Sequence, residues 1–254
     1  MCGIIGGVTN KDITPLLLDG LKRLEYRGYD SSGIVVLTKK NKLARERAVG
    51  KVVNLEDKLK EQKNNIEGFI GLGHTRWATH GEPSDTNAHP HMSNNSISVV
   101  HNGIIENYAE LKHEQIKQGY KFSSETDTEV IAHAIDFSMK SSNSLLEAVQ
   151  KTLKTLHGSY GLGIISSNHP HKLIAARKGC PLLIGIAKNG NYTASDQMAL
   201  LSVTKKFIFL EEGDVAELTL EKVTIYDKKG NTVKRPIKVS NLKDGQADLG
   251  TYDH

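Results

Sequence analysis

The chain begins with the heptapeptide MCGIIGG (residues 1–7), in which a cysteine directly follows a methionine. The apolar run after Cys2 predicts a short buried strand at the head of the chain. A free cysteine in such a strand is most often just a small buried apolar side chain. Its position allows a second interpretation. If Met1 is removed, Cys2 carries both a thiol and a free α-amine, and the amine can act as the base for the thiol nucleophile.

The composition is that of an ordinary globular protein and argues against several function classes. Of the 254 residues, 24% are charged and 38% are hydrophobic, and the net charge of +4 is spread along the chain. There is no dense basic tract and no apolar run of the roughly 20 residues that a membrane helix needs. We therefore expect neither a nucleic-acid partner nor a membrane partner. Two cysteines, Cys2 and Cys180, without a secretion signal indicate a reducing, cytoplasmic location.

Helix-start signals occur at three places in the chain. The first predicted helix has Thr14 as N-cap and Pro15 in its first turn, and it ends at Gly28. Two later helices begin where the sequence has capping-box spacing: Thr126 with Glu129, and Ser144 with Glu147. A further surface helix is expected after a hairpin within residues 39–68, and a short one at 194–201.

Short apolar runs between turn residues predict the strands. They fall at residues 2–8, 32–37, 69–74, 97–101, 160–166, 172–178, 182–187, 207–210 and 214–218. Strands and helices come in runs rather than in regular alternation, which favours an α+β fold with stacked sheets and covering helices. No linker-like segment interrupts the chain, so one domain is expected over residues 1–254.

The segment VVHNGIIEN (residues 99–107) is a candidate oxyanion site. A strand is expected to end at His101, which would leave Asn102 and Gly103 at the start of a helix. There, a side-chain amide and a backbone N–H could both face a developing negative charge. The same Asn-Gly pair is also a common tight turn.

The segment GHTRWATHG (residues 73–81) is expected to form a loop that could close over a ligand. Arg76 could hold a carboxylate through two parallel hydrogen bonds, or form a surface ion pair. Trp77 could belong to the loop or to the core. Asp127 could counter a substrate ammonium, or simply favour the first turn of a helix through the helix dipole. Spacing alone does not choose between these interpretations.

The histidines of this region allow a different kind of site. His74, His80, His89 and His91 lie close together in sequence, and His89-x-His91 on an extended segment could direct two imidazoles the same way. No clear set of Asp, Glu or Cys ligands accompanies them, so a metal-dependent hydrolase remains the alternative and no metal is the expectation. Cys180 lies between Gly179 and Pro181 and is interpreted as a turn residue.

Seven motifs in order carry a resemblance to a known family: MCGIIGG, RLEYRGYDSSG, GHTRWATHG, NAHPH, VVHNGIIEN, SETDTE and ASDQMALL. Together they resemble the glutamine amidotransferase domain of the N-terminal-nucleophile hydrolase type, over essentially the whole chain. The resemblance implies a four-layer αββα sandwich of two stacked antiparallel sheets. It also implies hydrolysis of L-glutamine to glutamate and ammonia through a cysteine thioester, without a cofactor.

The resemblance implies a role for each matching residue. Cys2, freed of Met1, would attack the side-chain amide, and Asn102 with the Gly103 N–H would hold the oxyanion. Arg76 would bind the substrate carboxylate and Asp127 its ammonium. The remaining roles are a closing loop with Trp77, Thr79 and His80, a further substrate contact at His89, and a supporting role for Arg27 near Cys2. A chain that had lost the chemistry would still bind glutamine, as a binding module.

Details of three motifs favour one branch of the family. The stretches EYRGY, TRWATHG and FIFLEEGDVAEL resemble the fructose-6-phosphate aminotransferase (glucosamine-6-phosphate synthase) branch more than the amidophosphoribosyltransferases, which are the alternative. In that branch the glutaminase part is followed by sugar-isomerising domains. These domains would be its partner in one polypeptide, with residues from about 240 to 254 at the start of the linker.

Overall fold

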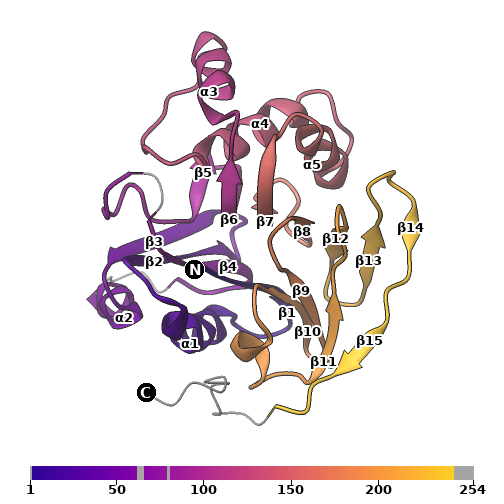
Figure 1. Cartoon of the computed structure of the whole chain (residues 1–254). Helices are drawn as coiled ribbons and strands as arrows, with labels where there is room; N and C mark the ends of the chain where they lie inside the picture. The colour runs from indigo at the N-terminus through magenta and orange to yellow at the C-terminus, as the bar shows by residue number, and fades with distance from the viewer. Residues whose placement is uncertain (1, 62–65, 79–80, 243–254) are drawn as a thin grey trace, which may run out of the picture.

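Two antiparallel sheets lie face to face between layers of helices (Figure 1). This is the architecture of a computed structural model, which describes residues 2–61, 66–78 and 81–242. All pairings between the named strands are antiparallel. The expected α+β fold with an αββα sandwich is confirmed.

The first sheet places the N-terminal strand at its centre. In spatial order its eight described strands are β15 (Ile237–Val239), β11 (Lys206–Phe209), β9 (Leu183–Ala187), β10 (Gly190–Ala194), β1 (Gly3–Thr9), β4 (Gly68–Arg76), β2 (Ser31–Thr38) and β3 (Leu43–Val49). Cys2 immediately precedes β1, so hydrogen bonds on both sides of that strand hold the cysteine in place.

The second sheet has its longest strands next to each other. Its seven described strands, in spatial order, are β14 (Thr232–Val233), β13 (Val223–Tyr226), β12 (Val215–Leu218), β8 (Leu173–Lys178), β7 (Gly158–Ser166), β6 (Ile97–Ile105) and β5 (His91–Ser93). Asn102 and Gly103 lie within β6, so the two halves of the predicted site come from different sheets.

Helices cover the outer faces of the sandwich. The described helices are α1 (Thr14–Leu24), the 3₁₀ turn η1 (Glu25–Arg27), α2 (Val52–Glu61), α3 (Tyr108–Lys117), α4 (Glu129–Met139), α5 (Leu145–Leu153) and the 3₁₀ turn η2 (Gln197–Leu200). Helices α1 and α2 pack on the first sheet, and α4 and α5 pack on the second. No helix among the described residues is both long enough and apolar enough to cross a membrane.

Alternating side chains produce the layers. In β1, Ile4 faces the other sheet and Ile5 faces the helices, because successive strand residues point to opposite faces. In β6, Val100 lies between the sheets while Val99 packs under α4 and α5. The apolar residues of β1 and β6 are therefore buried on both faces of their sheets, as is usual for sheets covered by helices.

Two predicted helix caps are wrong. Thr14 is the first residue of α1 and not its cap, since the Asp12 carboxylate accepts hydrogen bonds from the Thr14 N–H and hydroxyl. Thr126 does not cap α4, because the helix begins at Glu129 and the Glu129 carboxylate accepts from the N–H of Ser123 and Ser124 instead.

Two other predicted helix boundaries hold. Ser144 caps α5 by accepting a hydrogen bond from the Glu147 N–H at 3.2 Å. Gly28, with φ +93°, ends the helical segment that includes α1 and η1. This backbone conformation favours glycine because it has no Cβ.

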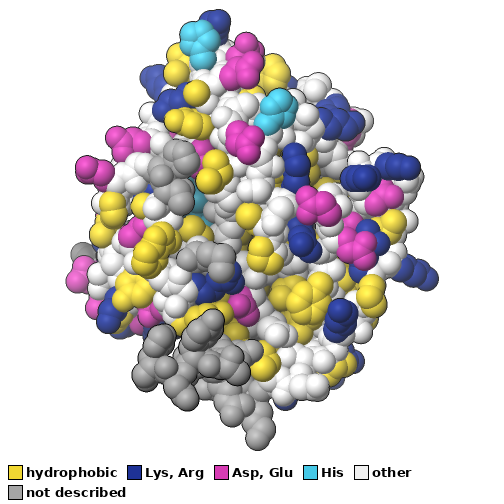
Figure 2. Space-filling view, viewed as in Figure 1, with side chains coloured by type: hydrophobic (Ala, Val, Ile, Leu, Met, Phe, Trp, Pro, Cys, Tyr) yellow, Lys and Arg dark blue, Asp and Glu magenta, His cyan; other side chains and the backbone are white. Residues whose placement is uncertain are grey.

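Charged side chains of both signs are interspersed over the face drawn in Figure 2. Lysine and arginine side chains lie beside aspartate and glutamate side chains, for example near the right-hand edge of the view. On this face, the charge does not gather into the basic stripe that is typical of a nucleic-acid site.

Candidate active site

A cavity of about 390 Å³ opens beside Cys2, where the two sheets meet. Every predicted site residue in the described part of the chain lines it: Cys2, Arg27, Arg76, Trp77, His89, Asn102, Gly103 and Asp127. Thr79 and His80 lie outside the described residues. The tertiary structure thus brings together side chains that are up to 125 positions apart in sequence, from residue 2 to residue 127.

The Cys2 thiol lies against the backbone of Trp77. Sγ is 3.2 Å from the Trp77 nitrogen, whose N–H donates to it, and 3.5 Å from the Trp77 oxygen. Burial raises the pKa of the thiol, and the nearby Asp30 charge adds to this effect, while the Trp77 N–H and Arg76 act in the opposite direction. The net shift is upward, so the thiol is protonated at neutral pH and needs a base before it can attack.

The Trp77 ring packs on the backbone at Gly28. A Cβ built on Gly28 would lie 2.1 Å from two ring carbons, so only glycine leaves room for this contact. Trp77 is nevertheless 54% exposed, which excludes the core-packing interpretation. Trp77 lines the cavity at the start of the loop.

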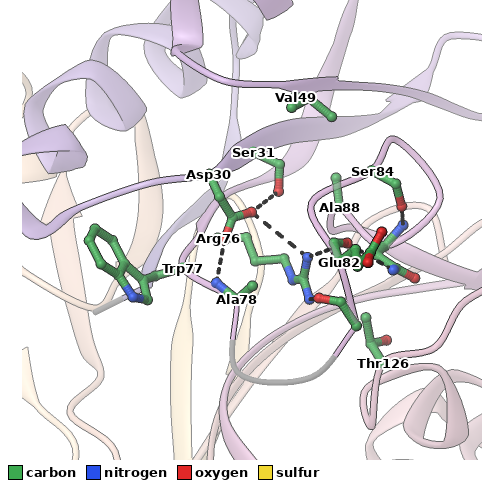
Figure 3. Close-up of polar contacts among 12 residues, drawn as sticks. Asp30, Ser31, Val49, Arg76, Trp77, Ala78, Glu82, Ser84, Ala88 and Thr126 are labelled. Carbon is green, nitrogen blue, oxygen red and sulfur yellow. Dashed lines mark hydrogen bonds and ion pairs between the residues drawn. The ribbon is translucent and has the colours of Figure 1, made fainter.

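Arg76 is buried and is held at the end of β4 (Figure 3). Its Nη2 donates to the Gly81 oxygen at 3.0 Å and its Nη1 donates to the Glu82 oxygen at 3.4 Å. Nη1 also lies 3.8 Å from an Asp30 carboxylate oxygen. The surface ion-pair interpretation is therefore wrong, and Arg76 supplies a buried positive charge to the cavity wall.

Asp30 is a site residue that the sequence reasoning missed. Its carboxylate accepts hydrogen bonds from the Ser31 hydroxyl at 2.8 Å and from the Ala78 N–H, and it also faces the Arg76 guanidinium (Figure 3). The carboxylate therefore fixes the first residues of the loop relative to β2. The position of Asp30 within the motif RLEYRGYDSSG could have identified it as a candidate.

Asn102 and Gly103 do not begin a helix, because β6 continues to Ile105. The Asn102 side-chain Nδ2 donates to the Cys2 carbonyl oxygen at 3.1 Å, across the gap between the sheets. Gly103 has φ +135°, and a Cβ there would lie 2.1 Å from the Ser159 oxygen on β7. The pair thus lines the cavity from within a paired strand and not from a helix N-terminus.

Asp127 lies before α4 and is anchored to β6. Its Oδ2 accepts a hydrogen bond from the Ile105 N–H at 2.7 Å, and the side chain is 5% exposed. The interpretation as a first-turn helix acid is wrong, since the helix starts two residues later at Glu129. A buried carboxylate facing the cavity is suited to a cationic group of a ligand.

Three of the histidines form a buried cluster beside the cavity, with their rings tilted or edge-on to one another. Ring centroids are 4.1 Å apart for His74 and His89, and 4.7 Å apart for His89 and His91. Burial lowers the pKa of all three, that of His74 to about 3, so the rings are neutral. Within residues 2–61, 66–78 and 81–242, no three His, Cys, Asp or Glu side chains are arranged to hold a metal ion.

Several lining residues were not predicted. They are His101, Ile104, Thr126, Thr128, Ser159, Cys180 and Pro181. Cys180, interpreted as a turn residue, reaches the cavity because the chain between β8 and β9 passes over β7. Local sequence around these positions holds no chemical signal beyond the motifs already quoted.

A family model described as a glutamine amidotransferase domain matches residues 74–202. Over all 254 residues the chain is 53% identical to the glutamine–fructose-6-phosphate aminotransferase [isomerizing] of Haemophilus influenzae and 52% identical to that of Yersinia pestis. The chain spans 41% of the length of each of these relatives.

Two solved structures share the fold of this chain. The glutamine phosphoribosylpyrophosphate amidotransferase from B. subtilis superposes with a TM-score of 0.75 at 26% identity, covering 91% of this chain and 50% of that one. A class-II glutamine aminotransferase domain protein from Silicibacter pomeroyi superposes with a TM-score of 0.60 at 13% identity, covering 89% of this chain and 99% of that one. The second likeness concerns the fold alone.

Proposed function

Because the chain belongs to the glutamine amidotransferase domain family, we propose that it hydrolyses glutamine to glutamate and ammonia with Cys2 as the nucleophile. One observation carries the proposal. The Cys2 thiol and the Asn102 amide, from different sheets, share a cavity with the buried cation Arg76 and the buried carboxylate Asp127.

The two buried charges suit the two charged ends of an amino acid. Arg76 is a buried cation that lines the cavity, and a guanidinium suits a substrate carboxylate because it can donate two parallel hydrogen bonds. The Asp127 carboxylate accepts a strong hydrogen bond from Ile105 on Oδ2, which leaves lone pairs for an ammonium group. With both ends held, the side-chain amide of glutamine would extend toward Cys2.

The proposed reaction has two stages. The Cys2 sulfur attacks the amide carbon, and the carbonyl oxygen becomes an oxyanion that accepts hydrogen bonds from Asn102 Nδ2 and the Gly103 N–H. When the tetrahedral intermediate collapses, the carbon–nitrogen bond breaks and ammonia leaves after taking up a proton. Water then attacks the thioester by the same route and releases glutamate.

The proton from the thiol goes to the α-amine of Cys2 itself. This assignment requires that Met1 is removed, because a peptide bond would abolish the basicity of that nitrogen. The raised thiol pKa supports it, since a protonated thiol needs a base within reach. A free α-amine has a pKa of about 8, so about a tenth of it is unprotonated at pH 7 and about half at pH 8.

We further propose that the chain is the glutaminase part of a fructose-6-phosphate aminotransferase. Support comes from the 53% identity over the whole chain, against 26% to the phosphoribosylpyrophosphate enzyme. Its partner would be a sugar-isomerising part, corresponding to the length of the relatives that this chain does not cover, and that part would use the ammonia to convert fructose 6-phosphate to glucosamine 6-phosphate. We place this function in the cytoplasm, where thiol nucleophiles stay reduced.

The test is an intact mass after incubation with an electrophilic glutamine analogue, followed by peptide mapping. We expect loss of Met1 and one adduct, located on Cys2. Cys180→Ala provides the matched control, because it removes the other cavity thiol and should keep the adduct. Cys2→Ala should lose both the adduct and glutamate release. Glutamate release that persists in Cys2→Ala would overturn the proposed function.

A further inference from the structure

One histidine contacts the oxyanion residue without lining the cavity. His74 on β4 is completely buried, and its Nε2 lies 3.0 Å from Asn102 Oδ1. The same nitrogen lies 2.9 Å from the His101 carbonyl oxygen and 3.1 Å from His89 Nδ1. The other ring nitrogen, Nδ1, is buried without a hydrogen-bond partner among the described residues.

These contacts determine the position of the proton on the His74 ring. The ring is neutral, so only one nitrogen carries hydrogen. The His101 carbonyl belongs to β6 and can only accept, so Nε2 must be the protonated nitrogen. An unprotonated Nε2 would place its lone pair against that of the carbonyl oxygen. His89 Nδ1 then also faces a donor and is itself unprotonated.

The protonated Nε2 in turn selects one orientation of the Asn102 amide. Oδ1 faces the His74 N–H, and Nδ2 therefore faces the Cys2 carbonyl oxygen 3.1 Å away. The flipped amide would set Nδ2 against a donor and Oδ1 against the Cys2 carbonyl, losing both hydrogen bonds. Nδ2 has a second hydrogen, and Asn102 lines the cavity, so this hydrogen is available to a ligand.

We propose that His74 is a positioning residue for glutamine hydrolysis, whose Nε2–H holds the Asn102 amide with its NH₂ group toward the reacting carbonyl. The proposal rests on the proposed function, because the oxyanion role of Asn102 belongs to it. His74 contacts no substrate atom in this scheme and acts only through Asn102. Its unpartnered Nδ1 fits this role, since the fold leaves one ring nitrogen unsatisfied while using the other for the site.

Two substitutions of similar size separate positioning from packing. In His74→Gln the amide nitrogen is as many bonds from Cα as Nε2 is, so a donor toward Asn102 is kept. In His74→Asn the amide nitrogen corresponds to Nδ1, and that donor is lost. We expect kcat for glutamine hydrolysis to fall roughly 10- to 100-fold in His74→Asn, less than the loss of a whole oxyanion donor. His74→Gln should stay within a few-fold of the parent, and KM should change little in both.

Three further readouts exclude a merely structural effect. Alkylation of Cys2 by iodoacetamide, followed by peptide mapping, needs no oxyanion and should keep the parent rate in His74→Asn. In an Asn102→Ala background, His74→Asn should lower kcat by almost nothing more, because both changes remove the same His74–Asn102 interaction. Nitrogen NMR of the unsubstituted chain should show His74 protonated on Nε2. This measurement does not depend on the folding of any variant.

The outcomes separate this inference from the proposed function. A His74 protonated on Nδ1, or equal losses in His74→Asn and His74→Gln, would overturn the positioning role. The positioning role would also be overturned if the kcat losses of His74→Asn and Asn102→Ala were fully additive in the double variant. If Cys2→Ala abolishes hydrolysis while both His74 variants match the parent, the proposed function stands and only the positioning role is wrong.

Discussion

The two walls of the cavity differ in how firmly they are held. The wall from the first sheet carries Cys2, Arg76 and Trp77, and Trp77 at the start of the loop is 54% exposed. The second wall has Asn102 and Gly103 within the paired strand β6, and Asp127, which is 5% exposed, is hydrogen-bonded to the backbone of that strand at Ile105. The proposed oxyanion and ammonium groups are thus held by strand β6. The nucleophile lies beside a partly exposed loop.

This difference matches the two demands on such a site. Electrostatic stabilisation works best when donors and charges are already fixed before the reaction, which favours a buried wall. A substrate must also enter and a product must leave, which favours a wall that ends in a loop. Changes in the second-sheet wall should therefore cost more in binding and rate than changes at Trp77.

Among changes that keep the Cys2 nucleophile, the largest expected effect is at Asp127. Asp127→Ala should lower kcat/KM for glutamine roughly 100- to 1,000-fold, because it removes the counter-charge of a buried ammonium. It should also lower the free energy of unfolding by about 1–3 kcal/mol, since the Ile105 N–H loses its acceptor. The measurements are steady-state kinetics and denaturant unfolding.

Asp127→Asn separates the two losses. Its Oδ1 can still accept from the Ile105 N–H, so most of the stability should return while kcat/KM remains low. If Asp127→Asn restores both, Asp127 acts on the fold and not on the substrate, and the comparison between the walls fails.

An intermediate effect is expected from pH, and it should come from the first-sheet wall alone. Below about pH 8 the Cys2 α-amine is protonated and cannot accept the thiol proton, so kcat/KM should fall about tenfold per unit. The histidines near Asn102 should not contribute, because burial lowers the pKa of His101 on the second sheet and lowers that of His74 on the first sheet to about 3, which keeps both rings neutral in this range. The measurement is kcat/KM between pH 6 and 9.

The matched control for the pH experiment is the chain with Met1 retained. Its Cys2 nitrogen is in a peptide bond, so we expect glutamine binding by calorimetry but no turnover at any pH. A flat pH profile in the Met1-free chain, or turnover in the Met1-retaining chain, would assign the base to another group.

The smallest effect is expected where the loop meets η1. Trp77→Ala should raise KM only a few-fold and change stability by less than about 1 kcal/mol, as is usual for a half-exposed residue. Gly28→Ala is the sharper change, because φ is +93° and the new Cβ would meet the Trp77 ring. It should cost about 1–3 kcal/mol of stability.

Combining the two changes tests the contact itself. In the Trp77→Ala background, Gly28→Ala should cost less, since the ring is gone and only the backbone strain remains. If Gly28→Ala lowers the stability equally in both backgrounds, the packing of Trp77 on Gly28 does not contribute to stability. Thermal unfolding measures all four chains.

Local signals predicted most elements but not their ends. Ser144 and Gly28 mark true boundaries because their hydrogen bonds and φ angles depend only on neighbouring residues. The prediction that β6 ends at His101 is wrong because β7 pairs with it as far as the Ile105–Gly158 position. Hydrogen bonds from a partner strand outweigh the turn preference of Asn102-Gly103, and a single segment does not show its partner.

The sequence by itself determined which chemical groups the proposed site contains. Residue type and motif indicated Cys2 after Met1, the Asn-Gly pair, Arg76 and Asp127, because the chemistry of a thiol, an amide or a carboxylate belongs to the side chain. Only the tertiary structure decided how these groups meet. The thiol pKa depends on burial, and the orientation of Asn102 depends on His74, a residue of the opposite sheet. Both effects arise from groups brought together by sheet packing, which no local stretch of sequence specifies.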